Sequence, residues 1–186
     1  MRKVCIILPF VLIAGMLYAC SSDDDSNLYE DIIQPVTLAD NPIAEFFNSE
    51  LPATNSRSSE SFFCTSEAFE GIVVYHPIMT NVVCLINSRQ ELEAIYSGSR
   101  ELPEIDFDKY TLIIGQQIMP CLGFYLAKKE LQVGDEGLIL KLYARNDSEI
   151  HAHMLQNLYY WELYPKLVQK VITVEDYKDY ANFPDL

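Results

Sequence analysis

The side chains best suited to metal chemistry in this 186-residue chain are two closely spaced histidines. His151 and His153 are separated by one residue, so on an extended strand both imidazoles would lie on one face, as half of a metal site. His76, Asp147 or Glu149 could complete such a site, but no spacing fixes a third ligand. The segment around the two histidines is polar and predicts a loop. We therefore expect solvated histidines and no metal.

Other patterns that support catalysis are missing from the sequence. It contains no Gly-x-Ser-x-Gly or Ser-x-x-Lys motif for an activated serine, and no glycine-rich phosphate-binding loop. The acidic pairs Glu101/Glu104 and Asp106/Asp108 do not follow the calcium-loop pattern and are expected on an exposed rim. We predict no catalytic residue, no cofactor and a protein that is not an enzyme.

An aromatic run near the C-terminus is the best candidate for a binding surface. It contains Tyr159, Tyr160, Trp161 and Tyr164, and such rings are favoured at interfaces. On a strand, Tyr159, Trp161 and Leu163 share one face, while Tyr160 and Tyr164 share the other. One face must belong to the core. The other is either a patch that stacks on peptides or sugars, or a second core face.

The N-terminus carries a different chemistry, at the thiol of Cys20. Residues 1–3 are cationic and residues 4–17 are apolar, which is the layout of a secretory signal peptide. The apolar run is shorter than the ~20 residues that a spanning helix needs. Residues 17–20 (Leu-Tyr-Ala-Cys) resemble the bacterial lipobox, which implies removal of residues 1–19 and acylation of Cys20. The alternative is an ordinary signal peptide that is cut nearby.

A short acidic stretch follows this cysteine. Residues 21–25 (Ser-Ser-Asp-Asp-Asp) are either a solvated spacer or resemble the export signal that sends some Gram-negative lipoproteins outside the outer membrane. Residues 20–41 are polar and acidic and predict a flexible tether. We therefore expect a protein of the outer membrane that is lipid-anchored and exposed at the cell surface.

The charge of the chain excludes one class of partner. Without residues 1–19 the chain has 11 Lys and Arg against 27 Asp and Glu, a formal charge of −16. Nucleic acid requires cationic patches, so we expect no nucleic-acid partner. Anionic lipid should also repel the domain, which leaves the N-terminal anchor as its membrane contact.

Three cysteines remain in the expected mature domain: Cys64, Cys84 and Cys121. The expected compartment is oxidising, so a disulfide is permitted there. We predict the pair Cys64–Cys84. The alternative is that all three are small buried hydrophobic residues.

The elements that position these residues can be read from local patterns. Asn41 is placed to cap a helix beginning at Pro42, and the capping box Ser88 to Glu91 predicts a helix over 89–97. Strands are expected at 61–65, 71–76, 81–86, 110–119, 124–133, 138–144, 158–164 and 166–174. The polar stretch 145–156 predicts a loop, and the acidic tail from Glu175 a helical turn or a frayed end.

The number and order of these elements predict the fold class. Strands dominate, and the regular alternation of strand and helix that gives a parallel sheet is missing. We expect an α+β fold with a mainly antiparallel sheet and two short helices. Residues 42–186 should form a single globular domain.

One stretch resembles a known family. Residues 102–115 (Leu-Pro-Glu-Ile-Asp-Phe-Asp-Lys-Tyr-Thr-Leu-Ile-Ile-Gly) resemble the Pro-x-x-Asp-Phe segment, hydrophobic strand and glycine of PrcB-like domains. Those domains are small and secreted or lipid-anchored, and their namesake is an accessory protein that stabilises a surface protease complex. Members continue with a Gly-Gly-Tyr-type turn and a β-hairpin. Here residues 122–125 (Leu-Gly-Phe-Tyr) stand at the turn with one glycine missing.

The resemblance covers about residues 81–145 and directs the expected function. It implies a non-enzymatic protein-binding or protease-accessory module that contacts another envelope protein. The alternative is a carbohydrate-contacting surface protein that uses the aromatic strand.

Overall fold

A computed structural model describes part of the chain, namely residues 32–37, 41–51, 61–69, 72–77, 80–148 and 154–180. The predicted signal peptide, Cys20 and most of the predicted tether lie outside these residues, as do His151 and His153. Neither helix in the described ranges is long and apolar enough to cross a membrane.

Strands outnumber helices in the described part of the chain. The helices are α1 (Pro42–Glu50) and α2 (Arg89–Ile95). The strands are β1 (Ile32–Ile33), β2 (Cys64–Phe69), β3 (Ile72–Pro77), β4 (Val82–Ile86), β5 (Tyr110–Met119), β6 (Phe124–Gly134), β7 (Gly137–Asn146), β8 (Gln156–Pro165) and β9 (Ile172–Tyr180).

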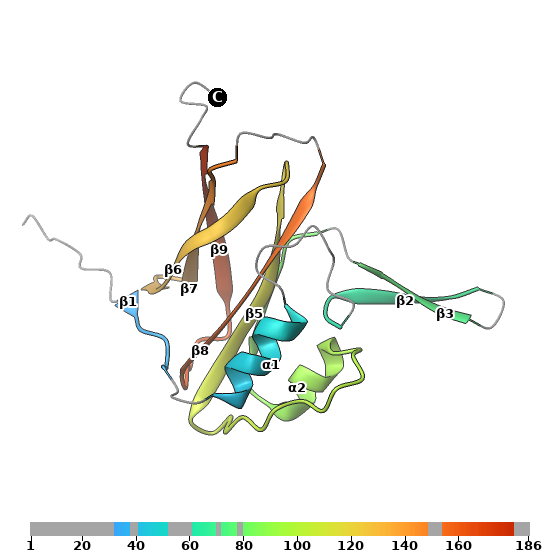
Figure 1. Ribbon diagram of the computed structural model, residues 1–186. Helices are drawn as coiled ribbons and strands as arrows, with labels where there is room; N and C mark the ends of the chain where they lie inside the picture. The colour runs from blue at the N-terminus through green and yellow to red at the C-terminus, as the bar shows by residue number, and fades with distance from the viewer. Residues whose placement is uncertain are drawn as a thin grey trace, which may run out of the picture.

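These strands form two larger sheets and a projecting hairpin (Figure 1). One sheet has the order β4-β5-β8, the other has the order β1-β6-β7-β9, and β2 and β3 make the hairpin. All of these pairings are antiparallel except that of β7 with β9, which is parallel. The predicted α+β class and the mainly antiparallel pairing are confirmed.

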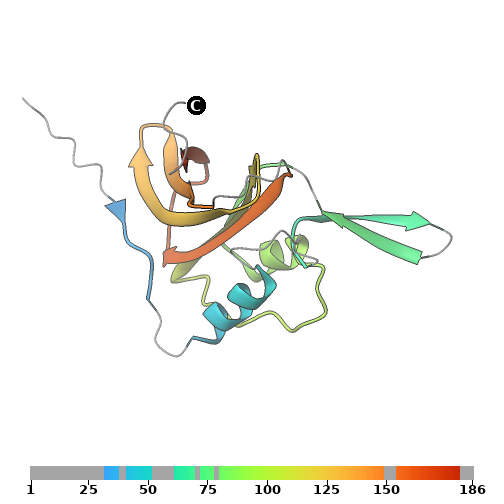
Figure 2. The ribbon, with the colours of Figure 1, turned by 45° about the horizontal axis from the view of Figure 1, so that its top comes forward.

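The sheet β4-β5-β8 is the middle of three layers (Figure 2). Helices α1 and α2 cover one face, and the four-stranded sheet covers the other. Alternate residues of β8 therefore point into different core clusters. Tyr159 and Leu163 pack toward the helices, whereas Tyr160 and Tyr164 pack toward the four-stranded sheet.

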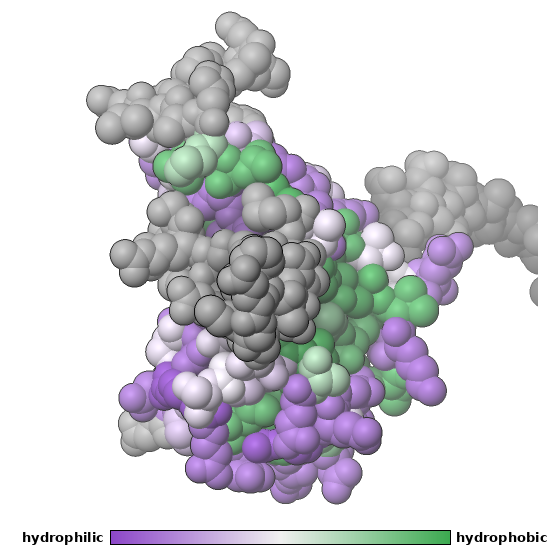
Figure 3. All heavy atoms as spheres, turned by 90° about the vertical axis from the view of Figure 1, so that its right-hand side faces the viewer, coloured by the Kyte–Doolittle hydropathy of each residue, from purple (hydrophilic) through white to green (hydrophobic). Residues whose placement is uncertain are grey.

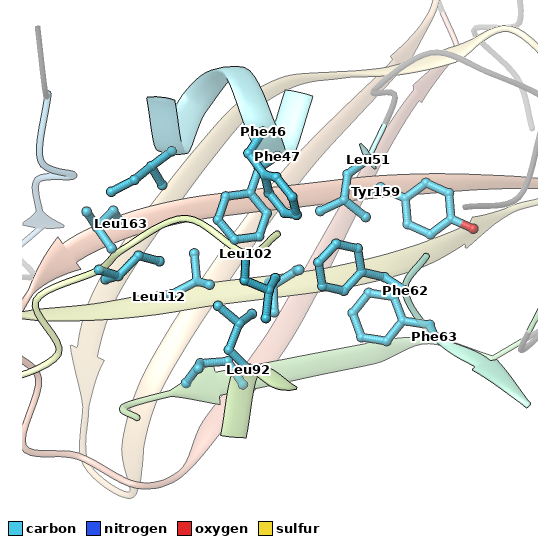
Figure 4. Close-up of a cluster of buried hydrophobic side chains, with 14 residues drawn as sticks. Phe46, Phe47, Leu51, Phe62, Phe63, Leu92, Leu102, Leu112, Tyr159 and Leu163 are labelled. Carbon is cyan, nitrogen blue, oxygen red and sulfur yellow. The ribbon is translucent and has the colours of Figure 1, made fainter. Parts of the chain in front are cut away.

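The cluster beneath the helices depends on the apolar face of α1 (Figure 4). Ile43, Phe46 and Phe47 are buried, as expected from their i, i+3, i+4 spacing. Asn41 caps this helix, because its Oδ1 accepts a hydrogen bond from the Ile43 N–H at 3.0 Å. The predicted start of α1 is confirmed, and Phe47 is 0% exposed.

Helix α2 begins as predicted but is shorter. Ser88 Oγ accepts from the Glu91 N–H at 3.2 Å, while the Glu91 carboxylate accepts from the Asn87 N–H at 2.6 Å. The reciprocal bond thus reaches one residue further back than in a standard capping box. The helix ends at Ile95, and Tyr96 is extended and forms a β-bridge with Phe62.

The hairpin β6–β7 follows the predicted alternation, but the C-terminal segment does not follow its prediction. Leu138, Leu140 and Leu142 are buried between the sheets. The helical turn or frayed end predicted from Glu175 is wrong, because residues 172–180 pair along β7 as β9. The strand predicted over 166–174 thus begins later than expected and continues through the acidic residues from Glu175, whose backbone groups this pairing satisfies.

One side of the surface is mainly hydrophilic where the chain is described. Seen from the side on which β2 and β3 project, hydrophilic residues cover much of the surface and border an apolar area (Figure 3).

Candidate functional site

Trp161 differs from the other aromatic residues of β8. Tyr159, Tyr160 and Tyr164 are only 2%, 4% and 2% exposed, because a layer covers each face of the strand. They are core residues on both faces of the strand, so of the two alternatives the second core face holds for these tyrosines, and they do not form the candidate binding surface. Trp161 is half-buried and remains in contact with a surface groove.

Helix α1 holds the Trp161 ring. The indole stacks on Phe47, with ring centroids 5.2 Å apart and an interplanar angle of 30°. Its Nε1–H donates to Asn48 Oδ1 at 3.0 Å. Two consecutive helix residues thereby fix both the plane and the polar edge of the indole.

The groove beside this ring is the candidate site, and we call it the Trp161 groove. It lies along β8 between α1 and β6 and has a volume of about 300 Å³, at the lower end of the range for ligand pockets. Its lining residues are Asn48, Leu51, Leu126, Lys129, Tyr159, Tyr160, Trp161 and Glu162.

An ion pair places charge in the groove. Lys129 Nζ lies 2.5 Å from Glu162 Oε2, and the two side chains are 26% and 27% exposed. The same ammonium donates to the Trp161 carbonyl at 2.8 Å. An ammonium has three donors, and these two partners engage two of them.

A β-bulge in β6 brings Leu126 and Lys129 to the same groove. Residues three apart on a regular strand point to opposite faces. The pairing of β6 with β7 shifts register between Leu126 and Lys128, so β6 contains one extra residue there. Because of this extra residue, the side chains of Leu126 and Lys129 lie on the same side of β6 and both line the groove.

The described end of the predicted tether crosses the same seam between β6 and β8. Ile32 pairs with Gln132 of β6, and the Val36 N–H donates to the Leu163 carbonyl of β8 at 2.7 Å. Residues 32–36 therefore close one end of the seam. The Trp161 groove is a stretch of that seam further along β8.

The residues considered as a possible metal site, which was not expected, are only partly covered by the described ranges. Asp147 accepts from the Tyr125 hydroxyl and from Arg145 Nε, both at 2.6 Å, and these bonds lower the pKa of Asp147. No group of three His, Cys, Asp or Glu side chains within the described ranges could hold a metal ion. His151 and His153 lie outside those ranges, so their role stays a prediction.

The cysteines occupy separate environments. Cys84 packs against the helix-side core, and burial raises the pKa of its thiol. Cys121 is buried and accepts a weak hydrogen bond from Asn146 Nδ2 at 3.5 Å. Cys84 carries a free thiol, so the structure does not contain the predicted Cys64–Cys84 disulfide. The pairing in an oxidising compartment stays a prediction.

A second depression lies between β4 and β9 and has a volume of about 350 Å³. Its polar groups are already engaged with one another. Gln117 Nε2 donates to Asp176 Oδ2 at 2.8 Å, and Lys178 pairs with the same carboxylate and lowers its pKa. This depression is a weaker candidate than the Trp161 groove.

The sequence indicated three residues that line the groove, Tyr159, Tyr160 and Trp161, and missed the others. Trp161 was found from its aromatic surroundings, but Asn48, Leu126, Lys129 and Glu162 carry no local signal. Comparison with protein-family models, curated proteins and solved structures gives no match to this chain.

Proposed function

We propose that this protein is an outer-membrane lipoprotein, anchored through Cys20, whose single surface-exposed domain binds a segment of another envelope protein in the Trp161 groove. The role is non-enzymatic. Cys20 and Ile32 are 12 residues apart in the sequence, a span of at most about 40 Å. The domain is thus held close to the membrane, where envelope partners lie.

One observation carries the proposal: Phe47 and Asn48 hold the Trp161 indole half-buried in a groove. Tryptophan is among the residues most enriched in protein-binding hot spots, and here it lies beside aliphatic side chains and an ion pair. The burial of three tyrosines removes the surface on which carbohydrate binding depended. That alternative therefore receives no support from the geometry.

A protease-accessory role is the specific form of protein binding that we favour. Over residues 81–145 the chain runs through α2, β5, a turn at Gly123 and the hairpin β6–β7. This is the order of elements that the resemblance to PrcB-like domains leads one to expect. It supports a surface protease as the partner.

The test is site-specific photo-crosslinking in intact cells. A photoreactive amino acid replaces Leu126, which lines the groove, and in a matched strain it replaces the exposed neighbour Ala127. We expect light-dependent adducts with one envelope protein from position 126 and none from position 127. Equal adducts from both positions, or none from position 126, would reject the proposal.

A further inference from the structure

The outer edge of β8 presents backbone groups to the seam. This strand is last in the order β4-β5-β8, and no strand of the described ranges pairs with its other edge. The carbonyls of Trp161 and Leu163, two residues apart, accept from Lys129 Nζ and the Val36 N–H. Groups on one edge of an antiparallel strand recur every second residue. The odd-numbered residues of β8 therefore direct their backbone groups toward β6.

The carbonyls of Leu163 and Trp161 accept hydrogen bonds from two different kinds of donor. Leu163 receives a peptide N–H from Val36, which is the kind of bond that an added strand makes. The Trp161 carbonyl, one strand repeat or about 6.8 Å along, receives the Lys129 ammonium instead. Lys129 therefore occupies the position where the next peptide N–H of an added strand would lie.

The rest of the groove suits the side chains of such a strand. Leu51 and Leu126 line it beside the indole of Trp161, and its volume of about 300 Å³ accepts side chains but not a folded surface. Lys129 also pairs with Glu162, so it keeps a partner when it leaves the carbonyl.

We infer that the partner binds as an extended segment that adds a strand to the outer edge of β8. Its backbone N–H replaces Lys129 at the Trp161 carbonyl, and one apolar side chain enters between Leu51, Leu126 and the indole. This inference rests on the proposed function and specifies its binding mode. In strand addition, backbone bonds give affinity and alternate side chains give specificity.

The chain contains a single tryptophan, so the fluorescence of Trp161 reports on the groove. The full-length protein in detergent is titrated with ten-residue peptides in which valine, leucine or phenylalanine alternates with threonine. Each peptide is also made in two N-methylated forms, with the methyl groups on one or the other alternate set of residues. Only one set of N–H groups can face β8.

We expect saturable changes in emission, a loss of affinity of at least about tenfold for one methylated set, and less than about twofold for the other. Equal effects of the two sets, or no saturable change with any peptide, would overturn strand addition. Tryptophan emission could also change with protein concentration alone, without peptide. If light scattering then showed dimers, the outer edge of β8 would be assigned to a second copy of the chain, and strand addition by a partner would be overturned.

The variant Lys129→Met separates the role of the lysine from that of the groove. It removes the competing donor from the Trp161 carbonyl, so peptide affinity should rise about three- to tenfold. The matched control is Lys128→Met, because that ammonium lies over the Tyr143 ring on the other face of the sheet. A fall in affinity with Lys129→Met would contradict the displacement.

The failures of the two proposals can be told apart. Specific adducts from position 126, together with peptide binding that methylation does not affect, would overturn strand addition and retain protein binding in the groove. Loss of both the adducts and the peptide binding would reject both.

Discussion

The indole of Trp161 lies against the ring of Phe47, with the two centroids 5.2 Å apart. This contact joins β8 to α1, and Phe47 is itself completely buried. One wall of the Trp161 groove is consequently part of the core packing and is held in place before any ligand arrives. Such preorganisation lowers the conformational entropy that a binding site loses when it is occupied.

Asn48 should control the orientation of the indole. In Asn48→Ala the Trp161 N–H loses its acceptor, so we expect a loss of about 0.5–1 kcal/mol in the free energy of unfolding. Tryptophan emission should shift to longer wavelength, and acrylamide should quench it more strongly. Asn48→Asp is the control, because it retains an oxygen acceptor. Wild-type emission from Asn48→Ala would show that the bond does not hold the ring.

Gly123 should be required for the turn that enters β6. Its φ is +97°, and an added Cβ would lie 2.8 Å from Asn146 Oδ1 and from Ser148 Cβ. Gly123→Ala should therefore cost at least about 1–2 kcal/mol, measured by urea unfolding. The control Gly134→Ala should cost less, because its Cβ meets the end of the Ile139 side chain. Equal losses from both variants would contradict this role.

Stability should fall at alkaline pH because of buried phenols. Burial raises the pKa of Tyr160 and Tyr164, so the folded state keeps protons that the unfolded state releases near pH 10. The free energy of unfolding should therefore decrease as the pH rises above about 10. Tyr164→Phe should make this decrease shallower in urea unfolding at pH 8 and pH 10.5.

The control for this pH dependence is Tyr177→Phe. The Tyr177 hydroxyl donates to Glu175, which raises its pKa, but the side chain is exposed and solvent weakens the interaction. Tyr177→Phe should therefore change the pH dependence of the free energy of unfolding less than Tyr164→Phe does. Identical slopes for the wild type and Tyr164→Phe would exclude Tyr164 as a cause.

Lipidation of Cys20 makes a prediction for the whole cell. Cys20→Ser should release the protein from the membrane fraction, because the acyl chains supply the membrane contact. In the wild type we expect protease to cleave the domain on intact cells, and mass spectrometry to find an acylated Cys20 peptide. A Cys20→Ser chain that still sediments with membranes would contradict the anchor.

The acidic run after Cys20 can be tested in the same cells. If residues 23–25 belong to an export signal, changing all three to asparagine should leave the protein lipidated but protected from external protease. Unchanged cleavage would show that the run is only a spacer.

Local patterns in the sequence predicted much of the fold because they act over short distances. The bounds of β5 match the prediction, which was made from the uninterrupted apolar residues 112–114 at its centre. The caps at Asn41 and Ser88 were predicted because a cap needs only its own helix. The last strand was predicted over 166–174, whereas β9 spans Ile172–Tyr180, because its C-terminal part depends on parallel pairing with β7, which the sequence near Glu175 does not indicate.

The site was harder to predict for a related reason. The strand alternation around Trp161 was correct, but the sequence could not show that both faces of β8 are covered. Lys129 enters the groove because of a bulge, and Asn48 reaches it from a helix far away in the chain. Both contacts depend on tertiary structure.

The most direct test of the central claim is crosslinking from position 126 in the Trp161→Ala background. If the indole is the hot spot of the groove, the yield of adducts should fall by more than about tenfold. The control Tyr177→Ala, on the four-stranded sheet, should retain the wild-type yield. An unchanged yield from Trp161→Ala, in protein shown by circular dichroism to be folded, would contradict binding in the Trp161 groove.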